Sequence, residues 1–201
     1  MAGPFFLRDC PKRIGLNRRG ASATTPGMNT TQLFTLSGFA AIAGGLLRIT
    51  VAFPVISDEI TLQWLYTGID VLLTFGIIGI YLDRAARLRI LGFASFVIAL
   101  AALSFIGGPD ADPFGFSTYE QGAVTLTIAL VGLSIAWISA GERPIFAPVC
   151  WFASVVAAGA LGLSPATEPY GFMVAGILFG LGFVLAGYDL ARRGSVAAGD
   201  A

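Results

Sequence analysis

The fold is decided by residues 63–107, QWLYTGIDVLLTFGIIGIYLDRAARLRILGFASFVIALAALSFIG. Two long apolar runs, 63–82 and 88–107, flank the short charged segment DRAAR. Each run has the roughly 20 residues that a helix needs to cross about 30 Å of hydrocarbon. Neither run alternates polar and apolar residues, as the strand of a membrane barrel does. The stretch therefore predicts two membrane-spanning helices joined by a basic turn.

The same signal recurs along the rest of the chain. Of its 201 residues, 56% are hydrophobic and only 12% are charged, and the mean hydropathy of +0.80 is too high for an ordinary soluble globule. We predict an all-α, polytopic integral membrane protein with six transmembrane helices that form three antiparallel hairpins. The six predicted helices are Gln32–Val55, Gln63–Leu82, Leu88–Gly107, Glu120–Ala140, Pro144–Leu163 and Gly171–Leu190.

The arginines predict the orientation, because basic residues resist translocation and stay on the cytoplasmic side. The segments on one side of the predicted helices contain arginines, whereas those on the other side contain acidic residues and no Lys or Arg. The basic segments are 8–19, 84–89, 143 and 192–193, and the acidic ones are 58–59, 110–120 and 168. We expect both termini in the cytoplasm, N-in and C-in, and the very short loops favour a bacterial cytoplasmic membrane.

The two ends of the chain differ from the six-helix domain at 31–190. Residues 1–30 are basic and rich in Pro, Gly, Ser and Thr, which predicts a disordered cytoplasmic tail. Such a tail could tether the chain to anionic lipids, or Met28 could be the true start and the upstream stretch untranslated. Residues 191–201 are expected to form a short cytoplasmic tail.

Arg48 and Asp70 are the charges expected well inside the hydrocarbon, at about 2.5–3.5 kcal/mol each. Each lies seven residues from the outer end of its predicted helix, hence about 10 Å deep. Equal depth predicts an ion pair, with Tyr66 and Thr74 beside Asp70 on one helical face. The pair could fix the register of two helices, or form a candidate ligand or proton site for a small polar or anionic solute.

Glycines predict where helices pack closely. Gly44 and Gly45 lie on the face of Arg48, and Gly176 and Gly180 form a GxxxG motif in the last predicted helix. Their partner helix could belong to this chain, to a second copy, or to a larger membrane complex.

A short motif recurs near the starts of the first, third and fifth predicted helices. It is GFA at 38–40, GFAS at 92–95 and WFAS at 151–154, and each hairpin ends in an acidic residue followed by arginine. Three repeated hairpins of the same orientation explain this recurrence, as does chance, because Phe and Ala are common here.

Composition excludes most catalytic chemistry. The chain has no histidine, the commonest general base and metal ligand, and only two cysteines. Twelve basic residues balance twelve acidic ones, so nucleic acid is not an expected partner. We expect no metal and no cofactor, and the lipid bilayer as partner. The predicted function is a non-enzymatic multi-pass membrane protein of unassigned role. The alternatives are a transporter or channel-like protein using Arg48 and Asp70, and an accessory subunit of a membrane complex.

Overall fold

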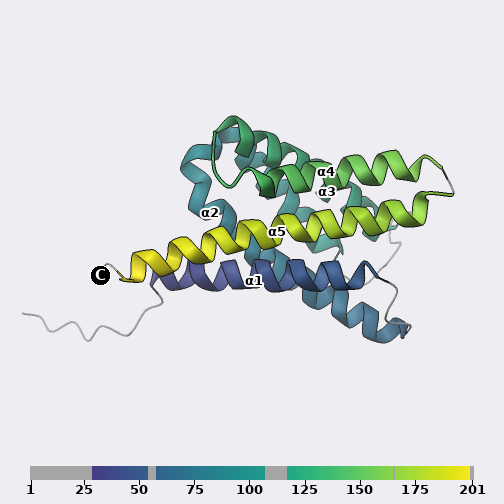
Figure 1. The fold of residues 1–201 in the computed structure, drawn as a ribbon, viewed down its shortest axis with the longest axis horizontal. Helices are drawn as coiled ribbons and strands as arrows, with labels where there is room; N and C mark the ends of the chain where they lie inside the picture. Colours follow the sequence, from purple (N-terminus) through teal and green to yellow (C-terminus); the bar gives the residue numbers. More distant parts are fainter. Residues whose placement is uncertain (1–28, 54–57, 107–116, 165, 200–201) are drawn as a thin grey trace, which may run out of the picture.

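The computed structural model describes residues 29–53, 58–106, 117–164 and 166–199, and these residues form an all-helical bundle (Figure 1). Its five helices are α1 (Thr30–Val51), α2 (Glu59–Ile106), α3 (Thr118–Ser139), α4 (Phe146–Gly162) and α5 (Glu168–Gly199). All except α4 are long and apolar enough to cross a membrane; α4 is apolar but has only 17 residues. The all-α prediction and the membrane-type composition are therefore confirmed at the level of four candidate spans.

The prediction of six separate helices is not confirmed, because the predicted runs 63–82 and 88–107 both lie within the 48 residues of α2. The segment expected to be a turn, 83–87, is helical. It contains Ala, Arg and Asp but neither Gly nor Pro, so nothing in it ends a helix. The helical backbone is broken instead at Arg89, with φ 54° and ψ −161°, a conformation that L side chains rarely adopt.

The two halves of α2 fold back on each other across this break. Tyr81 and Phe96 are fifteen residues apart, which is about 22 Å along a straight helix. Their rings are nonetheless stacked with centroids 4.1 Å apart. In Figure 1, α2 turns near the end of the bundle where α5 finishes. Helix α2 thus consists of two antiparallel helical segments.

The helices form a closed circuit of neighbours. α1 packs along the first half of α2 and along α5, the second half of α2 packs on α3, and α4 lies between α3 and α5. The interior is filled by large apolar side chains, among them Leu73, Leu130, Trp137, Trp151 and Phe183. Large apolar side chains also cover the outside of all five helices. A surface of this kind suits lipid as the solvent.

Close packing of glycines joins α1 to its neighbours. A Cβ atom on Gly45 would lie 2.5 Å from the carbonyl oxygen of Gly180, and the reverse distance is also 2.5 Å. Gly176 faces Ala52, and Gly44 faces the side chain of Leu73 on α2. The partner helices of these four glycines therefore lie within this chain.

Two predicted boundaries need correction. The last helix does not end at Leu190 but continues to Gly199, so Arg192 and Arg193 are helical. No Gly or Pro precedes Gly194 in this stretch to end the helix earlier. The first helix ends at Val51, before the predicted Val55. The basic tail at 1–28 and the acidic loop at 107–116 lie outside the described residues.

Candidate functional site

A hollow of about 330 Å³ surrounds Asp70, between the two halves of α2. We call it the Asp70 hollow. Its lining consists of four polar and three apolar residues: Asp70, Thr67, Thr74 and Ser104, with Val71, Phe75 and Leu103. The first half of α2 supplies Asp70 and the second half supplies Ser104, so the hollow depends on the break at Arg89. Asp70 and Thr74, two of the predicted site residues, share this hollow.

The hydroxyl groups of the Asp70 hollow all donate to the backbone of their own helix. Thr67 donates to the carbonyl of Gln63 at 3.0 Å, Thr74 to that of Asp70 at 2.7 Å, and Ser104 to that of Leu100 at 2.9 Å. A hydroxyl group that donates its proton to a carbonyl in this way keeps its lone pairs, so towards a ligand it can act only as a hydrogen-bond acceptor. Together with the carboxylate, the three oxygens make the polar part of the hollow an acceptor surface.

The other two predicted site residues lie outside the hollow. The guanidinium of Arg48 lies over the ring of Tyr66, with its carbon 5.5 Å from the ring centroid. Arg48 and Asp70 form no ion pair within 4.0 Å, although both belong to the described part of the chain. The expected pair is thus not formed, because Arg48 contacts the aromatic ring one helical turn before Asp70.

A second polar region, which the sequence did not predict, lies where α2, α3 and α5 meet. We call it the charge cluster; its members are Asp83, Arg84, Arg87, Glu142, Asp189 and Arg193. At its centre the side chain of Arg84 is fully buried. Its Nη2 lies 2.5 Å from Asp189 and its Nη1 2.9 Å from Asp83. The guanidinium carbon also lies 4.2 Å from the ring centroid of Trp137.

The other residues of the charge cluster connect further segments of the chain to Arg84 and its two partners. Arg193 lies 2.9 Å from Asp189 through Nε, and its Nη2 donates to the carbonyl of Arg143 at 2.8 Å. Arg87 donates to both oxygens of Glu142, at 2.7 and 2.8 Å. The charge cluster therefore joins three segments of the chain: the part of α2 just before its break, the turn between α3 and α4, and the last turns of α5.

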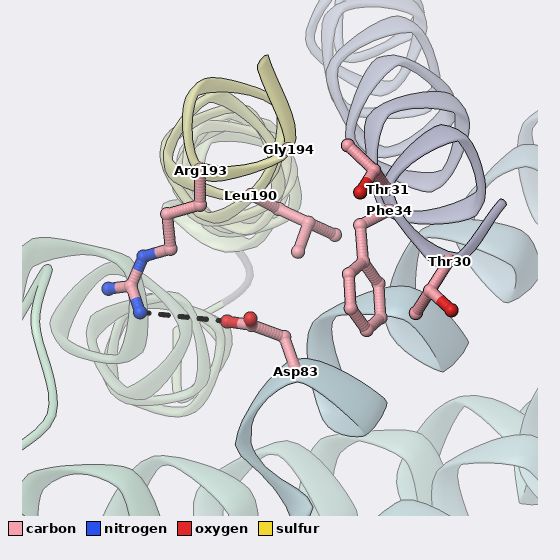
Figure 2. A pocket seen from close by; sticks show the side chains of 7 residues that line it. All are labelled: Thr30, Thr31, Phe34, Asp83, Leu190, Arg193 and Gly194. Atoms are coloured by element: carbon pink, nitrogen blue, oxygen red, sulfur yellow. Dashed lines mark ion pairs between the residues drawn. The ribbon is translucent and has the colours of Figure 1, made fainter. Parts of the chain in front are cut away.

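A smaller pocket of about 250 Å³ adjoins the charge cluster, and Figure 2 shows its lining. We call it the terminal pocket; it is formed by Thr30, Thr31, Phe34, Asp83, Leu190, Arg193 and Gly194. The first turn of α1 and the last turns of α5 form its walls, and Asp83 reaches in from α2. The loosest ion pair of the charge cluster, 3.7 Å between Arg193 and Asp83, lies in this pocket.

Sequence reasoning missed Arg84 because it stands at the end of an apolar run, where a charge is expected to reach water. The recurring acidic–arginine ends of the three predicted hairpins were the signal that could have found it. Asp83-Arg84, Glu142-Arg143 and the 189–193 segment are the sequences that meet in the charge cluster. No family model, no curated protein and no solved structure matches this chain.

Proposed function

We propose that the chain is a multi-pass integral membrane protein that crosses the bilayer six times, with both termini in the cytoplasm. The two halves of α2 supply two of the crossings, and the short helix α4 supplies a fifth beside α5. The arginines of the charge cluster gather at one end of the bundle, together with the start of α1. By the positive-inside rule that end faces the cytoplasm, and a bacterial cytoplasmic membrane is the proposed location.

Within this topology we propose that the protein binds a small monovalent cation or primary ammonium in the Asp70 hollow, as a transporter or channel-like protein does. The main observation behind this proposal is that the hydroxyl groups of Thr67, Thr74 and Ser104 all donate their hydrogen bonds to backbone carbonyls. Carboxylate and hydroxyl oxygens suit a hard cation or an N–H donor. An ionisable residue within a membrane segment marks an ion or solute pathway by default.

The position of Arg48 disfavours the anionic solute expected from the sequence. An anion would need the guanidinium in the lining, but the hollow is lined by the carboxylate and Arg48 lies over Tyr66. The lining also contains a single carboxylate, so it lacks the acid and base pair of a hydrolytic site. We therefore propose binding and passage, not catalysis.

The role of an accessory subunit finds less support. That role required a free glycine face on the last helix, available to a partner. Gly180 instead faces Gly45 of α1, and Gly176 faces Ala52, the residue that follows α1 in the same chain. A docking surface for another protein must then use other residues.

Cation binding is tested on the purified full chain in detergent by isothermal titration with Na⁺, K⁺ and methylammonium. The parent should bind at least one of these probes. Asp70→Asn keeps the shape of the side chain and removes its charge, and should weaken binding at least about tenfold. Asp58→Asn is the matched control, because Asp58 is exposed before the first turn of α2 and lies outside the hollow. Equal binding by Asp70→Asn and the parent, or tighter binding of chloride or sulfate, would overturn the proposal.

The six crossings are tested separately by reporter fusions. Fusions after Arg89, Arg143 and Arg193 should report the cytoplasm, and a fusion at Asp58 the opposite side. The same side for Asp58 and Arg89 would show that the first half of α2 does not cross the membrane.

A further inference from the structure

The terminal pocket has a cationic side chain in its lining, which the Asp70 hollow lacks. Its polar rim has a cation, Arg193, and an anion, Asp83, together with the hydroxyls of Thr30 and Thr31. Its apolar lining is formed by Phe34 and Leu190 (Figure 2). A pocket with a polar rim and an apolar wall fits an amphiphile. At about 250 Å³ it is smaller than the roughly 300–1,000 Å³ of a site for a drug-sized molecule, so it suits a small head group.

Two polar groups in this pocket have unused capacity. Oδ2 of Asp83 is buried beside Nη1 of Arg84, at 2.9 Å, and Nη1 of Arg193, at 3.7 Å, whereas Oδ1 takes part in no hydrogen bond or ion pair among the described residues. The Asp83 side chain is 15% exposed, so Oδ1 can accept from an N–H or O–H donor in the pocket. Arg193 has its Nε and Nη2 engaged by Asp189 and the carbonyl of Arg143, while Nη1 makes only the long contact in the pocket. That nitrogen can bind an anionic oxygen.

The charged side chains beside the terminal pocket indicate which net charge a ligand in the pocket can have. Two arginines, Arg84 and Arg193, face two carboxylates, Asp83 and Asp189, so the group beside the pocket is neutral as a whole. Adding a lone anion or a lone cation would leave a partly buried charge without compensation. A zwitterion adds one charge of each sign and meets both unused groups.

We propose that the terminal pocket binds the head group of a zwitterionic phospholipid with a primary amine, phosphatidylethanolamine being the chemical type. The phosphate would meet Arg193 and the hydroxyls of Thr30 and Thr31, and the ammonium would donate to Asp83. The upper acyl chain would follow Phe34 and Leu190 out of the pocket. The proposal rests on the cytoplasmic end of the bundle lying at the level of the head groups, as in the proposed topology. It does not depend on a cation at Asp70.

The test uses delipidated full-length protein in detergent, loaded with phosphatidylethanolamine, phosphatidylcholine or phosphatidylglycerol of identical acyl chains and observed by native mass spectrometry. Phosphatidylcholine is the matched lipid control, because its methylated ammonium has no N–H to donate to Asp83. The parent should retain phosphatidylethanolamine about tenfold more than either other lipid, the effect of hydrogen bonds to a charged group. Equal retention of the three lipids, or a preference for phosphatidylglycerol, would overturn the proposal.

Protein variants locate the site. Thr30→Val with Thr31→Val keeps the size of both side chains and should reduce the retention of phosphatidylethanolamine and of phosphatidylcholine by a similar factor, because both lipids carry the phosphate that these hydroxyls would meet. Thr50→Val is the matched control at the other end of α1, where the hydroxyl is exposed and donates to the carbonyl of Leu46. Unchanged retention in the double variant, with an unchanged melting temperature, would place the lipid elsewhere. Complete displacement by soluble glycerophosphoethanolamine at equal concentration would refute the lipid as source and show that the pocket takes the free head group.

Discussion

Replacing Arg84 by methionine tests whether the charge cluster holds the bundle together. The side chain of Arg84 is fully buried and contacts both Asp83 and Asp189. Removing one partner of a buried ion pair costs about 3–5 kcal/mol, because the other charge is left without compensation. The two carboxylates are 15% and 24% exposed, and Arg193 remains within 4.0 Å of both. Water and Arg193 therefore moderate the loss, and we expect about 3 kcal/mol.

The double variant Arg84→Met, Asp189→Leu separates pairing from packing. It removes one charge of each sign and leaves Asp83 and Arg193 as a neutral pair. It should be about 2 kcal/mol more stable than the sum of the two single losses. Arg192→Met is the matched control, because Arg192 is exposed on the same turn of α5 and forms no ion pair within the described part of the chain. Its effect should stay within about 0.5 kcal/mol.

Unfolding by SDS from mixed micelles gives these free energies. Tryptophan fluorescence reports on Trp137, which lies against Arg84, and far-ultraviolet circular dichroism provides a second probe that does not depend on that contact. Coincident transitions are required before the free energies are compared. If Arg84→Met were no more damaging than Arg192→Met, or if the losses of the two single variants simply added, the cluster would not be a cooperative clamp.

Three smaller predictions concern single sites, the first two measured by the same SDS titration. Gly180→Ala should cost about 1–3 kcal/mol, because its Cβ would meet a backbone oxygen at 2.5 Å, whereas Gly159→Ala, with nothing within 4 Å, should be neutral or stabilising; equal effects would contradict the close approach. Arg89→Gly should stabilise by about 1 kcal/mol, since glycine adopts its backbone conformation without strain, and a loss would mean that the side chain is needed there. The hydroxyl and the N–H of Thr61 lower the pKa of Asp58, so Thr61→Val should raise that pKa towards 3.8 in a ¹³C NMR titration, and an unchanged value would refute the contact.

The helices themselves could be predicted because the information for them is local. An apolar run of the right length is a property of about 20 consecutive residues, and the runs in α1, α3 and α5 were found from composition alone. The position of the break in α2 could not be found in this way. The charges at 83–87 suggested a loop, but helix formers continue through them and the break comes at Arg89. The packing of the two halves of α2, for example Tyr81 on Phe96, decides which residue adopts the non-helical conformation that reverses the direction of the chain.

The charge cluster could be predicted only in part. Its centre, Arg84, is buried by Trp137 and Asp189, which are distant in sequence and which no local pattern connects to it. The repeated motif carried some of this information. Asp83 and Glu142 are 59 residues apart, the same spacing that separates the Phe-Ala-Ser of 93–95 from that of 152–154. If equivalent ends of repeated hairpins meet at one end of a bundle, their charges also meet.

Arg48 and Asp70 show what a depth argument leaves out. Counting residues from a helix end places two charges along the membrane normal, but it does not place them around the helix axes or say where long side chains reach. Tyr66 precedes Asp70 by four residues, so it lies about 6 Å nearer the N-terminal end of α2. Arg48 lies over that ring and not at the carboxylate. The face of an aromatic ring attracts a guanidinium group, so Tyr66 competes with the carboxylate of Asp70 for Arg48. Arg48 thus contacts an aromatic ring, and the hollow at Asp70 is lined by three hydroxyl groups and not by the guanidinium. The equal depth that predicted an ion pair between Arg48 and Asp70 therefore did not bring the two side chains against each other.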